Sequence, residues 1–150
     1  MTLLYLEDFA PGQTWTSASQ VVTADEIIEF ATRYDPQPFH TDPEAAAKTF
    51  FGGLAASGWH TAALTMGLMV RCDFKPASGL VGAGVDELKW PNPLRPGDEI
   101  HVDLEVQEVR RSTSKPDRGI VCVAMRTLNQ DGKVMQSGIA NVVVPARATR

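Results

Sequence analysis

Asp35 and His40 stand five positions apart in the segment RYDPQPFHTDPEA, residues 33–45, and they are suited to acid–base chemistry. A carboxylate and an imidazole directed at one point can hold a single water, one group taking a proton and the other giving one. Fully extended, the interval would hold the two groups roughly 17 Å apart. Pro36 and Pro38 remove conformations of the interval without closing it, so the pair can cooperate only if the loop curls.

Other interpretations of these polar residues remain open from the sequence. An acid that ends a helix and a loop histidine packed on Phe39 would explain Asp35 and His40 without chemistry. Helix capping alone explains Asp42, and His60 suits a core or pocket wall better than the role of a second base. His40, Asp42 and His60 lack the close spacing of metal ligands, so we expect no metal ion.

Composition favours one domain, residues 1–150, in a soluble class of protein. The hydrophobic fraction is 43%, the charged fraction 21% and the net charge −4, which gives no overall attraction for nucleic acid or an anionic membrane. Cys72 and Cys122 lie far apart within apolar stretches, which indicates buried thiols in a reducing compartment. The N-terminus lacks the basic region of a signal peptide, so we expect a cytoplasmic protein.

The first half of the sequence carries helix signals. Residues 13–22, rich in Thr, Val and Trp, indicate a strand, and Thr23 with Glu26 then forms a capping box that opens a helix. That helix must end near Asp35, because Pro36 disfavours the α region at the preceding residue. A second helix is predicted from Asp42 as N-cap and Pro43 at the first helical position.

The third predicted helix starts after Ser57, a candidate N-cap, and is apolar on almost every side as far as residue 70. A helix of that composition is expected to be surrounded on most sides, and it is shorter than the ~20 residues of a membrane span. Four extended segments joined by turns follow, at residues 80–90, 99–111, 119–129 and 133–144. Helices followed by an antiparallel meander predict an α+β fold, with the long helix buried against a curled sheet.

The segments DPQPFHTDP and FGGLAASGWHT resemble the MaoC-like hydratase family, which includes the (R)-specific enoyl-CoA hydratases, and LKWPNPLRPGDEI resembles the strand–turn–strand that follows the helix there. The resemblance covers most of the chain in order. It implies a hot-dog fold, a bent antiparallel β-sheet wrapped around one long central helix. It also implies a homodimer, with higher homo-oligomers left open.

The resemblance implies roles for individual residues. Asp35 and His40 fall on the two catalytic positions, and the Gly58 N–H falls where it would receive the thioester oxygen. Orphan N–H groups at a helix start stabilise negative charge, and glycine leaves room for a thioester to approach. The sequence departs from the family pattern at two positions, Gln37 and Ser57. The candidate substrate-binding residues are Gln37, Phe39, Ser57, Trp59 and His60, with core packing an equally good explanation of Phe39 and Trp59.

The implied activity is reversible addition of water to a trans-2-enoyl-CoA, giving an (R)-3-hydroxyacyl-CoA. The acyl-CoA is the substrate and no cofactor is expected. One alternative is thioester hydrolysis on the same fold, which is disfavoured because residues 61–71 contain no acid where hot-dog thioesterases usually place one. The other is an acyl-CoA binder without catalysis. The basic residues that would meet the CoA phosphates stay open among Arg71, Lys75, Lys89, Arg95 and Arg118.

Overall fold

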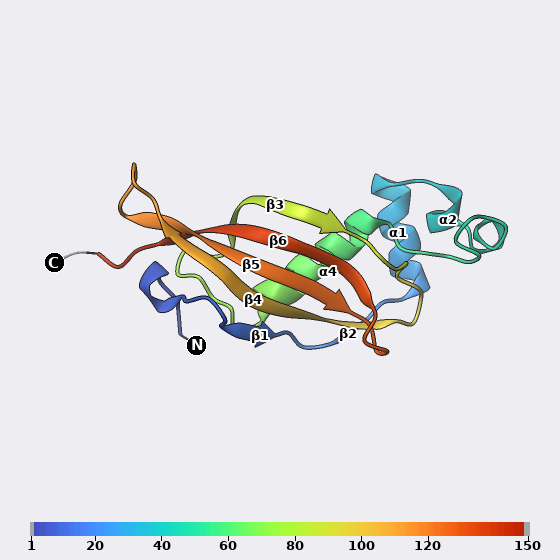
Figure 1. Cartoon of the computed structure of the whole chain (residues 1–150). Coiled ribbons are helices and arrows are strands. Elements are labelled where there is room, and N and C mark those ends of the chain that lie inside the picture. Colours follow the sequence, from blue (N-terminus) through green and yellow to red (C-terminus); the bar gives the residue numbers. More distant parts are fainter. Residues whose placement is uncertain (1, 149–150) are drawn as a thin grey trace.

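One curved antiparallel sheet with a long helix across one of its faces makes up most of the protein (Figure 1). The computed structural model describes residues 2–148. The strands are paired in the order β1-β4-β5-β6-β3, and β2 is paired with β4. The elements in chain order are η1 (Leu6–Asp8), β1 (Thr14–Thr16), β2 (Gln20–Val21), α1 (Ala24–Tyr34), α2 (Pro38–Thr41), α3 (Pro43–Ala46), α4 (Gly58–Arg71), β3 (Val81–Lys89), β4 (Glu99–Arg111), β5 (Arg118–Leu128) and β6 (Val134–Pro145).

The long strands supply the core that faces α4. In β4, Ile100, Val102, Leu104 and Val106 alternate with more exposed residues and are fully buried, which confirms the period-two pattern. The four predicted extended segments agree with β3, β4, β5 and β6 to within one residue at each end. The sheet with its single long helix is an α+β hot-dog fold, as expected.

The N-terminal strand prediction was only partly right. Residues 13–22 form two short strands separated at residues 17–19. Ser17 is the cause of the break, because its Oγ accepts the Val102 N–H at 2.8 Å while its own N–H donates to the Val102 carbonyl. A side-chain hydroxyl thus replaces one backbone acceptor of the ladder, and the strand bends at that residue.

The helix predictions near the site also need correction. Thr23 and Glu26 form the capping box and α1 ends at Tyr34, as predicted. Asp42 caps α3 through its side chain, but α3 has only four residues. The preceding loop contains an unpredicted helical turn, α2, with Pro38 at its start. Ser57 occupies the N-cap position of α4 without making a side-chain cap.

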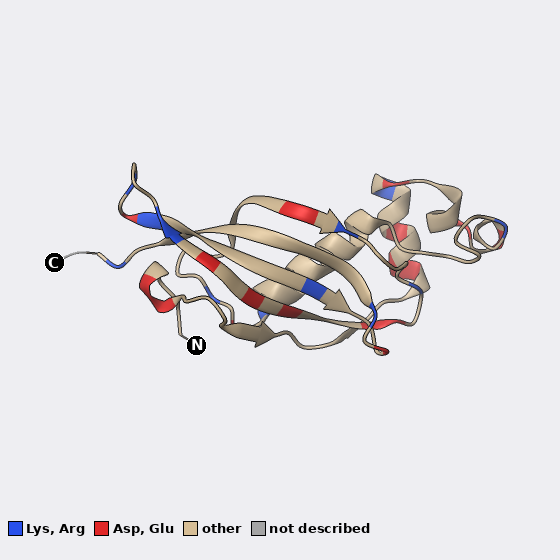
Figure 2. Cartoon of the chain, in the orientation of Figure 1, with Lys and Arg blue, Asp and Glu red and all other residues tan. Residues whose placement is uncertain are grey.

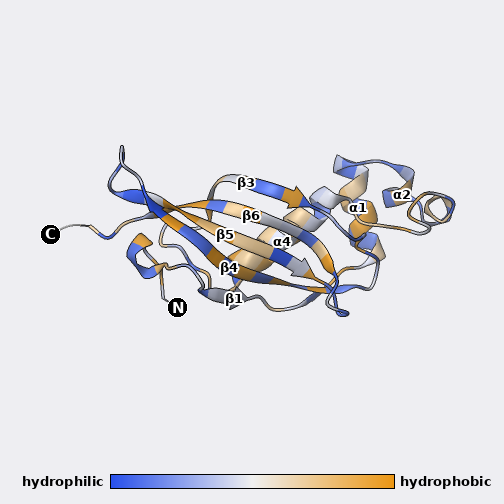
Figure 3. Ribbon diagram, in the orientation of Figure 1, coloured by the Kyte–Doolittle hydropathy of each residue, from blue (hydrophilic) through white to orange (hydrophobic). Residues whose placement is uncertain are grey.

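The expectation that α4 is surrounded on most sides is wrong for the isolated chain. Its residues Thr65 and Leu68 are buried, whereas Met66 is 46% exposed and Trp59 and Val70 are exposed as well. Beside this open flank lies β3, the edge strand of the sheet, whose residues 81–87 are all exposed. Apolar and polar positions alternate along the strands in Figure 3.

Charge is spread over the surface. Acidic residues occur on α1, β3 and β4, and basic residues flank the turn between β4 and β5 (Figure 2). Both cysteines, Cys72 and Cys122, are buried and free, so their predicted burial is confirmed. Within residues 2–148 no helix combines the length and the apolar character that crossing a membrane requires.

Candidate active site

The loop after α1 curls and brings Asp35 and His40 together. Asp35 ends the helix, with its N–H donated to the Ala31 carbonyl, and His40 follows on the single turn of α2. The distance from Asp35 Oδ2 to His40 Nε2 is 3.3 Å. The His40 side chain is 6% exposed and that of Asp35 21%, so the pair is mostly shielded from bulk water.

The other nitrogen of the His40 ring fixes how this pair can interact. His40 Nδ1 lies 2.6 Å from the Ala55 carbonyl oxygen. A carbonyl can only accept a hydrogen bond, so Nδ1 must carry the proton. In the neutral ring Nε2 then presents a lone pair toward the Asp35 carboxylate. A water molecule, which has two hydrogens to donate, satisfies both acceptors at once, and this arrangement therefore suits a shared water.

The charged form of Asp35 is favoured by its neighbours. Burial by itself would raise the pKa of Asp35, but hydrogen bonding from the Gln37 side chain and the nearby Ser57 hydroxyl, together with the charge of His40 when its ring is protonated, outweigh it and lower the pKa below the ordinary value of 3.8. Ser57 Oγ is buried and makes no hydrogen bond within residues 2–148, so the bond from Gln37 is the one that the geometry supports. Asp35 is therefore a carboxylate at neutral pH and available as a base.

Gly58 shares a cavity with His40. The cavity has a volume of about 340 Å³. Gly58 is the first residue of α4, so its N–H has no acceptor within the helix and is free for a ligand. Asp35 is not on the cavity wall itself but contacts His40, which is. The remaining lining residues are Phe50, Phe51, Ala56, Thr61, Trp90, Pro91, Asn92, Pro93, Leu94 and Met135.

Trp90 is the main wall residue that sequence reasoning missed. Its ring lies against Gly58, where a Cβ would come within 2.5 Å of Trp90 Cδ2. Its Nε1–H donates to Gln136 Oε1 at 2.9 Å, and Trp59 meets it edge-on. Glycine at position 58 is thus required by a tryptophan ring, in addition to any need of a thioester. The only sequence signal was the position of Trp90 in the turn segment that resembles the family.

None of the five candidate substrate-binding residues lines this cavity, and only Gln37, Phe39 and Ser57 lie beside the Asp35–His40 pair. Gln37 is exposed and bonded to Asp35, and Ser57 is buried at the start of α4. Phe39 lies edge-on to the His40 ring, with centroids 4.4 Å apart, and supports it. Trp59 is exposed beside Trp90. None of these four, nor His60, belongs to the lining of the cavity that contains His40 and Gly58.

His60 borders a different hollow, between α1 and α4. Its ring is buried and stacks on Phe30, with centroids 4.6 Å apart and planes inclined by 7°. Nδ1 of His60 has no hydrogen-bond partner in the part of the chain that the structure describes. Burial lowers the pKa of His60, and the charge of Glu26 offsets only part of this effect. His60 is therefore a neutral wall residue, as the sequence suggested, although one of its polar atoms is unsatisfied.

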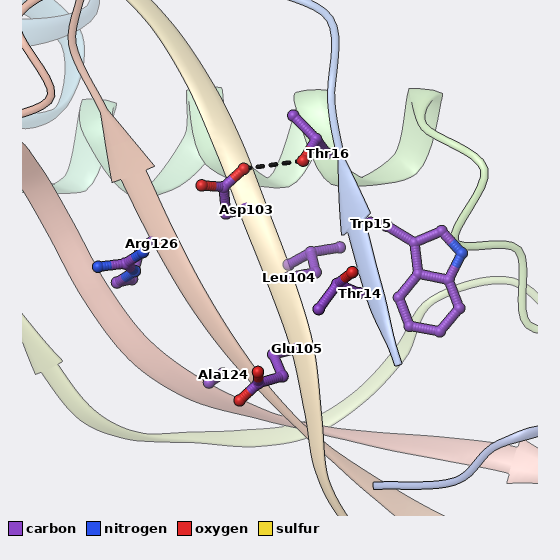
Figure 4. A pocket seen from close by; sticks show the side chains of 8 residues that line it. All are labelled: Thr14, Trp15, Thr16, Asp103, Leu104, Glu105, Ala124 and Arg126. Carbon is purple, nitrogen blue, oxygen red and sulfur yellow. Dashed lines mark hydrogen bonds between the residues drawn. The ribbon is translucent and has the colours of Figure 1, made fainter. Parts of the chain in front are cut away.

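A larger hollow than the one beside His40 lies elsewhere, along β1 and β4 (Figure 4). Its volume is about 510 Å³, and Thr16 Oγ1 donates to Asp103 Oδ1 there at 2.9 Å. Figure 4 shows Arg126 and Glu105 on the neighbouring strands. None of the candidate catalytic residues borders it. Size alone therefore does not identify the site, and the convergence of polar groups at His40 does. Within residues 2–148 no three His, Cys, Asp or Glu side chains are grouped to hold a metal ion.

Comparison with known proteins agrees with this geometry. A MaoC-like domain model matches residues 8–127, and the chain belongs to the MaoC-like family of hydratases and dehydratases. A crystal structure of the MaoC-like dehydratase from Rhodospirillum rubrum is 53% identical and superposes with a TM-score of 0.93, over 97% of this chain and 99% of that one.

Two curated relatives are similar over most of their lengths. YdeM, an uncharacterized protein of Bacillus subtilis, is 30% identical over 93% of this chain and 97% of its own. The (R)-specific enoyl-CoA hydratase of Aeromonas caviae is 31% identical over 81% of this chain and 86% of its own. The family of this chain is thus established.

Proposed function

We propose that this protein is an acyl-CoA hydratase, adding water reversibly to a trans-2-enoyl-CoA to give the (R)-3-hydroxyacyl-CoA. The observation that carries the proposal is the Asp35–His40 pair at 3.3 Å, with His40 sharing a cavity with the free amide of Gly58. The relative from Aeromonas caviae, whose name states this activity, supports the choice of reaction.

The proposed steps use only these groups. Asp35 accepts a proton from the shared water while the water oxygen forms a bond to C3 of the enoyl chain. The Gly58 N–H stabilises the negative charge that develops on the thioester oxygen. The proton passes across the short gap to His40 Nε2, which delivers it to C2. One water is added in total, and both side chains return to their starting states while Nδ1 of His40 keeps its bond to Ala55 throughout.

The cavity suits an acyl chain. Its walls include the apolar side chains of Phe51, Leu94 and Met135, and its volume falls in the range of sites for small molecules. The substrate is a coenzyme A thioester, and the proposed reaction involves no further cofactor or metal.

The proposal includes a homodimer. Among the strands of residues 2–148, the edge strand β3 is paired with β6 alone, and Met66, Val85 and Leu80 line an apolar groove of about 230 Å³ beside it. A second copy added at this edge would pair the outer backbone groups of β3 and cover the open flank of α4. The dimer would then avoid the free-energy cost of exposing the strand edge and the apolar flank to water.

The test of the reaction is a spectroscopic assay with crotonyl-CoA and longer enoyl-CoAs. Hydration consumes the conjugated thioester, so its absorbance band falls, and chiral analysis of the product must give the R isomer. A thiol dye reports the alternative, thioester hydrolysis, by detecting free CoA. Binding of acyl-CoA without turnover of any enoyl chain would contradict the proposal and favour the non-catalytic alternative.

A further inference from the structure

Arg95, in the turn between β3 and β4, is anchored to the backbone of a distant loop. Its Nη1 donates to the carbonyls of Gly53, at 2.9 Å, and Leu54, at 3.2 Å. Its Nη2 donates to the carbonyl of Phe51. No ion pair within residues 2–148 includes Arg95, so its charge is directed at these three carbonyl oxygens rather than at a carboxylate. This arrangement makes Arg95 unsuitable for CoA phosphates.

The loop held by Arg95 leads directly to the group that orients His40. Residues 47–57 contain no helix or strand. Immediately after the three bonded carbonyls, the Ala55 N–H donates to the Phe39 carbonyl at 3.1 Å, and the Ala55 carbonyl accepts from His40 Nδ1. A shift of this loop would therefore move the acceptor that selects the tautomer of His40.

Arg95 itself is held rigidly enough to act as an anchor. Its N–H donates to Asp98 Oδ2 at 2.8 Å, and the buried Asp98 carboxylate is fixed on its other oxygen by Gln130. The Ala56 N–H also donates to the carbonyl of Leu94, which ties the same turn to the loop beside Ala55. A planar guanidinium can bond several carbonyls of one loop at once, whereas a lysine ammonium supplies a compact charge without that fixed fork.

We infer that Arg95 is a positioning residue, which fixes the 51–55 loop so that the Ala55 carbonyl keeps the proton of His40 on Nδ1 and the lone pair of Nε2 directed at the reacting water. The inference rests on the proposed hydratase function for its kinetic consequence. Its structural consequence, the tautomer of His40, can be measured whether or not the reaction is hydration.

The experiment compares wild type, Arg95→Met, Arg95→Lys and the control Arg111→Met. Arg111, at the end of β4, also donates to a backbone carbonyl, that of Pro116, and to Glu7, so its substitution removes a bonded arginine that has no contact with the loop beside His40. NMR of isotope-labelled histidine reports the tautomer of each of the three histidines, assigned with His40→Ala. Enoyl-CoA hydration gives kcat and KM, and circular dichroism verifies folding.

For Arg95→Met we expect His40 to lose its single Nδ1–H tautomer and kcat to fall by about 10-fold or more, with KM nearly unchanged, as for other residues that orient a catalytic group. For Arg95→Lys we expect a tautomer population of His40 and a kcat between those of Arg95→Met and wild type. If Arg95→Met does not fold, Arg95→Lys tests the inference in its place. An unchanged His40 tautomer in the folded variant overturns the inference. A wild-type enzyme that hydrates no enoyl-CoA overturns the proposed function instead, and leaves the tautomer measurement valid.

Discussion

The indole ring of Trp90 lies against the Cα of Gly58, with no room for a side chain at position 58. Three ring atoms of Trp90 would come within 2.7 Å of a Cβ built there. The contact joins the residue that follows β3 to the first residue of α4, and both residues line the cavity that contains His40. The position of the free Gly58 amide therefore depends on a residue 32 positions further along the chain.

Gly58→Ala should destabilise the protein by about 1–3 kcal/mol and reduce hydration, because the added methyl group must displace the Trp90 ring. In a Trp90→Ala background the same substitution should cost much less, since the clash is gone. Urea unfolding of the four proteins in this cycle measures the coupling. Gly67→Ala in the same helix is the control, because its Cβ would meet only the flexible end of Arg71. If the two substitutions change the free energy of unfolding additively, the contact between Trp90 and Gly58 does not cause the cost of Gly58→Ala.

Asp35→Asn and His40→Ala should each lower kcat for hydration at least about 100-fold, because each removes one partner in proton transfer. The fold should survive, since neither Asp35 nor His40 belongs to the cluster of buried apolar side chains that forms the core. A second His–Asp pair, His101 and Asp103 on β4, lies 3.7 Å apart and supplies matched controls. Asp103→Asn and His101→Ala should turn over at the wild-type rate. Full activity in either Asp35→Asn or His40→Ala would exclude the proposed mechanism.

Gln37→Leu should move the acidic limb of the pH profile of kcat/KM to higher pH. The hydrogen bond from Gln37 stabilises the charged carboxylate, so its loss raises the pKa of Asp35 while the opposing effect of burial remains. The base is then protonated at a higher pH than in the wild type. Gln107→Leu is the control, because Gln107 donates to Glu105, also two residues away, on the exposed side of β4. A limb that stays in place in Gln37→Leu would mean that another group limits the rate in acid.

The stability of the fold should depend on pH through His60. Its folded-state pKa lies below the ordinary value of 6.5, so the unfolded chain binds a proton that the folded chain does not. The contribution of neutral His60 to the free energy of unfolding is fully present above pH 6.5 and is lost as the pH falls below that value. Urea unfolding at pH 7.5 and pH 5.5 should show a smaller loss in His60→Gln than in wild type. His101→Gln, which replaces a half-buried histidine on β4, supplies the comparison. An equal loss in His60→Gln and wild type would contradict the prediction.

Val85→Lys should convert the proposed dimer to a monomer, because a charge would enter the apolar groove beside β3. Light scattering at several concentrations measures the mass. Val21→Lys is the matched control, since Val21 is 52% exposed and Val85 49%, but Val21 lies on β2 at the opposite end of the sheet. If Val85→Lys has the same mass in solution as a dimeric wild type, the interface does not include this groove.

The sequence by itself determined the elements. Local signals decide where strands and helices begin and end, so the alternation in β4, the capping box at Thr23 and the proline after Asp35 were enough to place them. Local signals failed at Ser17, where the hydroxyl binds a strand 85 positions away, and in α2, whose single turn is too short to leave a periodic pattern.

Only the tertiary structure decided what surrounds Asp35 and His40. The spacing of Asp35 and His40 pointed to shared chemistry, but their 3.3 Å separation, the Ala55 carbonyl behind His40 and the Trp90 ring over Gly58 depend on contacts between distant segments. The same is true of Arg95, which from its type alone was a candidate for phosphate and is in fact bonded to the backbone. The residue type determines the chemistry of a side chain. The partners of that side chain depend on packing, which exists only in the folded chain.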